Sequence, residues 1–207
     1  MKAFTWSCAG ACLAAAMSAS AQEQGAAVAV VPREQIHRHV GGFLRPDLGV
    51  GYIAMRTSDD AALNGIAGTL GFAAGVAIAP DSILALHVWS AAVKDPSLSM
   101  AGSSGAGSST VTLFAVGPEY TFYSKDNYYF SVSPALTRIT LESNGASGAT
   151  NWGVGLRTSV GKEWWVGEHW GLGVVGQLSL SLNEDSGQNA PTWTTWATTV
   201  SFSATYN

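Results

Sequence analysis

The hydrophobic pattern of the chain is clearest between Asn151 and Leu182, where large apolar residues alternate with small or polar ones on both sides of one turn. Successive side chains of a strand point to opposite faces, so this alternation places the apolar residues together. Before the turn, one face holds Trp152, Val154, Leu156, Thr158 and Val160, and the other Gly153, Gly155, Arg157, Ser159 and Gly161. Such a hairpin fits either a soluble sheet over a core or a membrane barrel whose apolar face meets lipid.

Eight segments of the chain show this period of two. In order, they are Asp47–Thr57, Gly65–Ala79, Ile83–Lys94, Thr110–Tyr123, Tyr128–Leu141, the two arms of the hairpin in Asn151–Leu182, and Thr194–Tyr206. In the fifth segment the phase slips near Arg138, because Ile139 and Leu141 have the opposite parity to the preceding apolar residues. We therefore predict a bulge or the edge of the membrane at this point.

The connections between these segments alternate in length. The long, polar ones are Thr57–Asn64, Asp95–Ser109, Glu142–Thr150 and Asn183–Pro191, and the short ones are Pro80–Ser82, Ser124–Asn127 and Glu163–His169. Long loops at one end and short turns at the other are typical of bacterial outer-membrane barrels. An even number of strands places both termini at the short-turn end. The sequence thus predicts an eight-stranded antiparallel up-and-down β-barrel over residues 42–207, with both termini in the periplasm.

Aromatic residues gather near the short turns and the C-terminus. They are Tyr120, Phe122, Tyr123, Tyr128, Tyr129, Phe130, Trp164, Trp165, Trp170 and Tyr206. Aromatic side chains concentrate at the membrane–water interface. We therefore predict a periplasmic aromatic girdle of Tyr120, Phe122, Tyr128, Trp164, Trp165, Trp170 and Tyr206, with a sparser one opposite from Tyr52, Trp152, Trp193 and Trp196. A soluble β-sandwich or a lipocalin-like barrel is the alternative fold, but neither requires aromatics at alternate turns.

The N-terminal residues have the pattern of a secretory signal peptide. Lys2 precedes an apolar run, and Ala19-Ser20-Ala21 matches a small-x-small cleavage site, so we expect residues 1–21 to be removed. Cleavage removes Cys8 and Cys12, which are the chain's two cysteines. A mature chain without thiols suits an oxidising periplasm. We interpret residues 22–41 as a periplasmic lead-in, and His37 and His39 as part of a polar tail.

Composition narrows the functional classes. Charged residues are 12% of the 207 residues, and the formal net charge is −4. A weakly acidic surface argues against a nucleic-acid partner. A secreted chain with few charges, many glycines and no apolar helical span favours the other structure that can cross a bilayer, a closed barrel.

The eight alternating segments, the stretch Gly117–Ser133 (GPEYTFYSKDNYYFSVS), the GKEWW of Gly161–Trp165 and the terminal strand VSFSATYN resemble the small eight-stranded outer-membrane barrels of Gram-negative bacteria. This class holds the OmpA transmembrane domain, OmpX and OmpW. The terminal strand resembles the signal that the barrel assembly machinery recognises, although it ends in Asn207 rather than in an aromatic residue. The resemblance implies architecture and location, but it does not imply an activity.

Inward-facing charges are the first candidate site. By parity Glu119 and Arg157 both point into the barrel, at similar distances from short turns. A charge in so narrow an interior is costly unless it is paired. We therefore predict a polar network in the lumen that contains Glu119, Arg157 and Gln177, with Asp47 as a weaker alternative partner for Arg157.

Other candidates for chemistry are weaker. His87 lies on the inner face, but Ser90 has the opposite parity, so no nucleophile and base are in reach of each other. We interpret His87 as a residue that fills the lumen. The acidic pairs Asp59-Asp60 and Glu184-Asp185 belong to loops, where solvated charges are common. We expect no cofactor and no metal.

Two functional classes remain. The first is a non-enzymatic, monomeric barrel with a structural, adhesive or ligand-contacting role through its surface loops, in contact with outer-membrane lipid and lipopolysaccharide. The second is a small transport barrel for apolar or small solutes. A lipid A-modifying enzyme is a distant third. Eight strands enclose an interior that side chains can fill, so the contents of the lumen decide between the first two.

Overall fold

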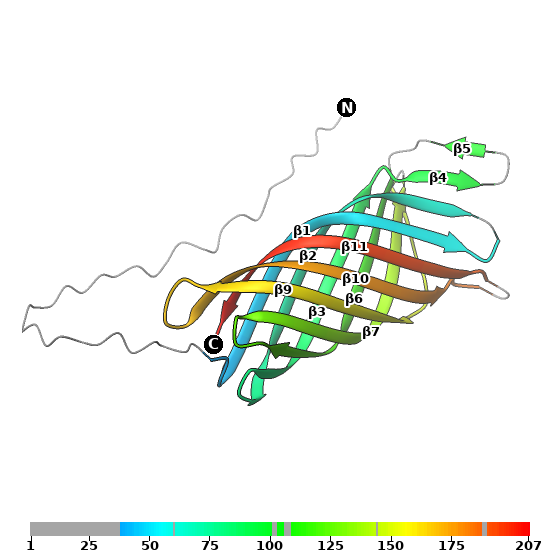
Figure 1. The fold of residues 1–207 in the computed structure, drawn as a ribbon. Coiled ribbons are helices and arrows are strands. Elements are labelled where there is room, and N and C mark those ends of the chain that lie inside the picture. The colour runs from blue at the N-terminus through cyan, green and yellow to red at the C-terminus, as the bar shows by residue number, and fades with distance from the viewer. Residues whose placement is uncertain (1–37, 60, 101–102, 106–108, 144, 188–189) are drawn as a thin grey trace, which may run out of the picture. The chain divides into compact units, whose positions relative to one another are not determined.

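The computed structural model describes residues 38–59, 61–100, 103–105, 109–143, 145–187 and 190–207, which form an all-β barrel (Figure 1). Its strands are β1 Gly42–Thr57, β2 Ala62–Ala79, β3 Ser82–Lys94, β4 Ser97–Met100, β5 Ser103–Gly105, β6 Ser109–Tyr123, β7 Tyr128–Ser143, β8 Ala146–Ala149, β9 Gly153–Trp165, β10 Trp170–Glu184 and β11 Thr192–Tyr206. In the described part of the chain, no helix has the length and apolar character needed to cross a membrane. The predicted signal peptide, most of the lead-in, and His37 lie outside the described residues.

Eight long strands close the barrel with antiparallel neighbours throughout. The order around the barrel is β1, β2, β3, β6, β7, β9, β10 and β11, and β11 pairs back onto β1. Full closure removes the exposed sheet edges that an open sheet would leave. This confirms the predicted fold class, an eight-stranded antiparallel barrel.

The short strands extend this barrel at the loop end, which we define as the end that carries the β1–β2, β3–β6, β7–β9 and β10–β11 connections. β4 pairs with β2 and β5, and β8 pairs with β7. Figure 1 shows β4 and β5 at the end opposite the C-terminus. That opposite end, which carries the β2–β3, β6–β7 and β9–β10 turns, is the turn end.

Several predicted boundaries are wrong. β1 begins at Gly42 rather than Asp47, and β2 begins at Ala62 rather than Gly65, so the first loop shortens to Ser58–Ala61. The bulge predicted near Arg138 is absent from the described pairing of β6 with β7, which keeps one register on both sides of it. Ile139 faces inward because the barrel interior is apolar there, not because the strand slips. The register instead shifts between Ala77 and Ala79, where β2 meets β3.

The outer surface is apolar along the strands. Exposed residues include Leu48, Val50, Ile66, Leu70, Phe72, Leu86, Phe130, Leu136, Val160, Leu178, Val200 and Phe202. The interior has apolar residues towards both ends. The loop-end cluster comprises Ile53, Met55, Leu63, Ala67, Trp89, Ala91, Val93, Val111, Leu113, Ala115, Ala135, Ile139 and Ala197. The turn-end cluster comprises Phe43, Ala73, Ile83, Ala85, Tyr123, Tyr129 and Val175.

Candidate functional site: the barrel interior and its mouth

The chain preceding β1 caps the turn end of the barrel. The side chain of Arg38 pairs with Asp81, with 3.1 Å between Nη2 and Oδ2. The backbone of His39 bonds the same residue twice, because its N–H donates to Oδ1 and its carbonyl accepts from the Asp81 N–H. The carbonyl of Gly41 accepts from the Ala77 N–H at 2.8 Å. Asp81 has a φ of 64°, a left-handed conformation in which its carboxylate can bond the incoming chain.

His39 is the centre of this cap. Its ring is fully buried and stacks on Tyr123 with 3.5 Å between the ring centroids. The side-chain amide of Asn207 lies 2.9 Å from Nδ1, and Nε2 lies 3.8 Å from Oε1 of Glu163. Burial lowers the pKa of His39 to about 4, and the bond to Asn207 and the charge of Asp81 oppose this shift only in part. The prediction of a polar tail at His39 is therefore wrong: the residue is an uncharged part of the packed interior at neutral pH.

A band of ionisable side chains, which we call the ionisable band, crosses the barrel between the cap and the loop-end cluster. Arg45 on β1 contacts Glu119 on β6, with 2.5 Å between Nη2 and Oε1. The other oxygen of Glu119 lies 2.9 Å from Nδ1 of His87 on β3. Nε2 of His87 lies 3.9 Å from Oδ2 of Asp47, whose Oδ1 lies 3.5 Å from Nη2 of Arg157 on β9. All five side chains are nearly inaccessible to solvent. Each buried charge thus has an opposite charge beside it, as burial demands.

Aromatic rings and a glycine shape this band. The guanidinium of Arg45 lies 4.9 Å from the Tyr129 ring centroid, and that of Arg157 lies 4.7 Å from the Trp89 ring centroid. Rings stabilise cations that lie over their faces. Gly71 is paired with Asp47 across the β1–β2 ladder, and a Cβ at this position would collide with the Asp47 carboxylate. The glycine therefore provides the space into which the carboxylate of Asp47 turns.

Gln177 extends the band to the closing strand. Its Nε2 donates to Oδ1 of Asp47 at 3.3 Å. Its Oε1 accepts from the hydroxyl of Thr199 at 2.6 Å and from that of Ser201 at 3.2 Å, both on β11. Ser201 in turn lies 3.4 Å from the hydroxyl of Thr69 on β2. These hydrogen bonds therefore link β2, β10 and β11 to the ionisable band.

The structure places Glu119, Arg157 and Gln177 in the interior, but it corrects the predicted partners. Glu119 pairs with Arg45 and His87 rather than with Arg157, and Arg157 pairs with Asp47, the weaker alternative of the prediction. Arg45 was missed because the predicted first strand began after it. The signal was present, since Phe43, Arg45 and Asp47 share the parity that Gly49 and Gly51 continue.

The mouth at the loop end contains a cavity of about 170 Å³. Its floor is apolar and is formed by Leu63, Val111 and Ile139, which also belong to the loop-end cluster. Around it lie Leu141, Gly148, Ala149, Thr150, Asp185, Ser186 and Trp193. A predominantly apolar cavity with a few polar groups at one side is the usual form of a small-molecule site.

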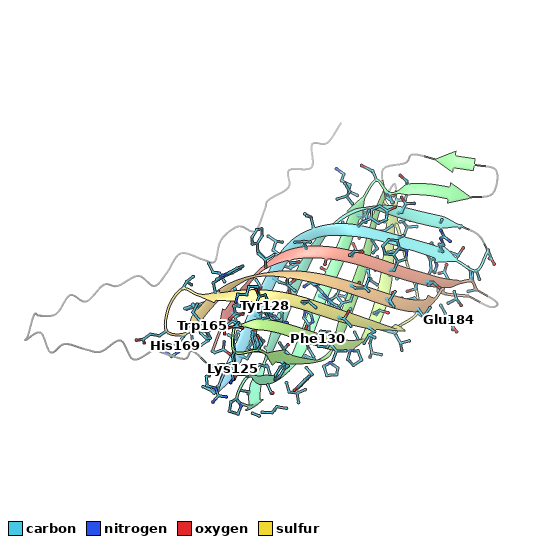
Figure 2. The ribbon with its side chains drawn as sticks, in the orientation of Figure 1. Lys125, Tyr128, Phe130, Trp165, His169 and Glu184 are labelled. Atoms are coloured by element: carbon cyan, nitrogen blue, oxygen red, sulfur yellow. The ribbon has the colours of Figure 1, made fainter. Side chains whose placement is uncertain are left out.

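The predicted girdle lies at the turn end, with one difference in orientation. Tyr120, Phe122, Tyr128, Trp164, Trp170 and Tyr206 are exposed on the outer surface. Trp165 is half-buried instead, its ring lies 5.0 Å from that of His39, and its Nε1 donates to Oδ1 of Asn127. Figure 2 shows Lys125, Tyr128, Trp165 and His169 near one another at this end and Glu184 at the opposite end. Tyr123 and Tyr129, which flank the β6–β7 turn, point into the barrel. At the other end, Tyr52, Trp152 and Trp196 are exposed, whereas Trp193 packs on the loop-end cluster.

The ionisable groups of the interior are paired with one another across the barrel. Both ring nitrogens of His87 face carboxylates, and each of those carboxylates also faces a guanidinium. Among the described residues, no group of three or more His, Cys, Asp or Glu side chains could hold a metal ion. His87 fills the lumen, as predicted, with 1% of its surface exposed.

Comparisons with known proteins identify the fold. No protein-family model and no curated protein matches the chain. Among solved structures, Neisserial surface protein A is 13% identical and superposes with a TM-score of 0.54, over 80% of this chain and 96% of that one. Lower TM-scores of 0.40 and 0.44 relate the chain to Ail of Yersinia pestis (9% identity, 79% of this chain and 99% of that one) and to OprG of Pseudomonas aeruginosa (12%, 82% and 97%). With its closed eight-stranded architecture, the chain has the fold of the small outer-membrane β-barrel proteins.

Proposed function

We propose that this protein is a non-enzymatic barrel of the outer membrane that is closed to ion flow and contacts its ligands at the loop end. The observation that carries the proposal is the filled interior. The His39 cap, the ionisable band and the loop-end cluster follow one another along the barrel. The band by itself joins side chains of four strands, β1, β3, β6 and β9.

The outer surface supports the location. Large apolar side chains such as Ile66, Val50 and Phe202, with exposed fractions of 79%, 65% and 75%, recur on the outward face of the strands. Soluble monomers rarely expose continuous apolar areas of this kind. A bilayer removes the cost, because lipid covers the apolar band and the closed ladder pairs the backbone groups of neighbouring strands. The exposed Tyr128, Trp164 and Trp170 then lie at the periplasmic interface.

The partners follow from this location. Lipid and lipopolysaccharide contact the outer surface, and the assembly machinery recognises the strands during insertion. Because lipid covers the apolar face, the barrel needs no second copy, and we propose a monomer without a nucleic-acid partner. The absence of an accessible base and nucleophile within the described interior supports a non-enzymatic role.

Recording in planar bilayers tests the proposal. Protein purified from membranes and shown to be folded by faster migration on unheated gels is inserted at known density. We expect no steady ohmic current, since the side chains of the ionisable band are nearly inaccessible to solvent. A steady current from the unmutated protein would overturn the closed barrel and favour the small transport barrel.

A further inference from the structure

The cavity in the barrel mouth has the size of a single small ring. A volume of about 170 Å³ resembles the roughly 150 Å³ of engineered apolar cavities that take up benzene. The floor residues Leu63, Val111 and Ile139 are at most 5% exposed, and the cavity is open to solvent on its other side, so a ring placed on this floor buries one of its faces. Transfer of apolar surface from water onto such a floor is favourable.

Among the described residues that line this cavity, the one charged side chain is an acid. It is Asp185, which follows β10, and the described lining includes no lysine or arginine. Its Oδ1 accepts from the Ser186 N–H at 2.7 Å, and among the described residues Oδ2 accepts one long hydrogen bond, of 3.5 Å, from Nε1 of Trp193. No described ion pair involves Asp185. The carboxylate therefore retains capacity to accept from a charged donor.

The position of Asp185 is fixed from both sides. Its N–H donates to the carbonyl of Pro191 at 3.0 Å, and its carbonyl accepts from Nδ2 of Asn151 at 3.2 Å. These bonds hold the loop after β10 against the start of β11 and against the chain that leads into β9. A carboxylate held at the edge of a preformed apolar cavity does not have to be ordered when a ligand arrives, which reduces the cost of binding.

We propose that the mouth cavity binds small arylalkyl ammonium compounds, with the ring on the apolar floor and the ammonium group at Asp185. The inference rests on the proposed function, because it gives the ligand class for the loop end. The charge selects the class: an amine gains a hydrogen bond together with an ion pair, an alcohol gains a hydrogen bond without the opposite charge, and a carboxylate is repelled.

Three probes that differ in their polar end test this proposal: phenethylamine, 2-phenylethanol and phenylacetate. They are titrated into the folded ¹⁵N-labelled protein in nanodiscs, and the indole N–H signal of Trp193, assigned with Trp193→Phe, reports on the cavity. We expect saturable shifts with the amine and about tenfold weaker binding of the alcohol, which lacks the positive charge; a tenfold difference corresponds to roughly 1.4 kcal/mol. Phenylacetate should not bind.

Variants separate the cavity from the general charge of the rim. Asp185→Asn keeps an oxygen acceptor for the Ser186 N–H, and it should bring the amine to the affinity of the alcohol. Ala149→Phe fills the cavity from β8 and should abolish binding of both. Glu142→Gln removes the same charge from the rim outside this cavity and should change nothing. Equal weakening by Glu142→Gln, equal affinity for phenylacetate, or no saturable shift at Trp193 would each overturn the site. Conductance is recorded on the same preparation. Absence of both current and amine binding would contradict the ligand class and agree with the closed barrel.

Discussion

Nη2 of Arg45 lies 2.5 Å from Oε1 of Glu119, and this contact joins β1 to β6, which are not neighbours in the barrel wall. Backbone pairing fixes each strand to the next one only. The Arg45–Glu119 contact instead spans the interior and fixes the distance between opposite parts of the wall. Glu119 also faces His87 at 2.9 Å and accepts from Thr121 at 3.1 Å, so its carboxylate has three polar partners.

Removing Glu119 should destabilise the barrel strongly. Glu119→Ala leaves the guanidinium of Arg45 buried without its partner, and loss of one member of a buried pair costs about 3–5 kcal/mol. Arg45→Ala combined with Glu119→Ala should recover part of this loss, because neither charge is then left alone. Urea unfolding of the protein in lipid vesicles, followed by tryptophan fluorescence, gives the free energies of all members of the cycle.

A matched double-mutant cycle combines Glu119→Ala with Arg157→Ala instead of Arg45→Ala. Arg157 pairs with Asp47 and not with Glu119. Its coupling energy with Glu119 should be smaller than that of Arg45. A larger coupling between Glu119 and Arg157 than between Glu119 and Arg45 would contradict the pairing that the structure assigns.

A charge on the outer face should be costly according to its depth. Leu178 and Leu182 both face outward on β10, with exposed fractions of 45% and 51%, but Leu178 is near the middle of the strand and Leu182 near its loop end. In the proposed bilayer, Leu178→Arg should lower the free energy of unfolding by about 2–4 kcal/mol, and Leu182→Arg by about 0–1 kcal/mol. Equal losses at the two positions, measured by the same urea unfolding, would argue against a membrane around the strands.

The His39 cap should loosen as the pH falls. The pKa of His39 is about 4 when the cap is docked, against about 6.5 for a free imidazole. Because the docked pKa is lowered, the undocked state binds more protons between these values. The docking energy is thus complete above pH 6.5 and is lost as the pH falls towards 4, by up to about 3 kcal/mol. Asp81, Glu163, Arg38 and Arg45 surround the ring and can change the size of this effect.

Amide hydrogen exchange measures the cap directly. The N–H of Ala77 donates to Gly41 and that of Asp81 to His39, so both should lose protection between pH 6.5 and 4.5 after correction for the intrinsic exchange rate. The N–H of Thr150, which donates to the carbonyl of Ile139 at the opposite, loop end of the barrel, serves as the control. In His39→Gln, which carries no titratable ring, the pH dependence should disappear. Unchanged protection of Ala77 and Asp81 in the unmutated protein would refute this account.

The period of two was enough to predict the barrel and the side of the wall on which most residues lie. Leu48, Val50 and Tyr52 face outward as their parity requires, and His87 and Trp89 face inward. Parity is a local property of the strand, so the sequence contains it directly. The partners of the inner charges depend on the stagger of all eight strands, which no single segment contains. Arg45 and Arg157 both point inward by parity, as Glu119 does. The register of the closed barrel determines which of the two pairs with Glu119.

The apolar interior had a sequence signal of a different kind. Near the loop end, apolar residues occupy both parities, as at Ile53 and Met55 against Tyr52, and at Val111 and Leu113 against Phe114. Two apolar faces on one strand mean that its inner side is not lined by water. The mouth cavity remained hidden, because Asp185 and Leu63 come to line one cavity through the pairing of β10 with β11, of β11 with β1 and of β1 with β2.

Which end of the barrel faces the outside can be tested with single cysteines. The predicted cleavage after Ala21 removes Cys8 and Cys12, so the mature unmutated protein is a thiol-free control. Asp59 is exposed in the β1–β2 loop at the loop end, and Lys125 is exposed in the β6–β7 turn at the other end. In the proposed topology, an impermeant maleimide applied to intact cells labels Asp59→Cys and leaves Lys125→Cys unlabelled until the outer membrane is permeabilised. The direction follows from the strand count, since eight antiparallel strands return the C-terminus to the end at which β1 begins, and a secreted precursor leaves that end in the periplasm. Labelling of Lys125→Cys but not Asp59→Cys on intact cells would invert the topology and place the mouth cavity in the periplasm.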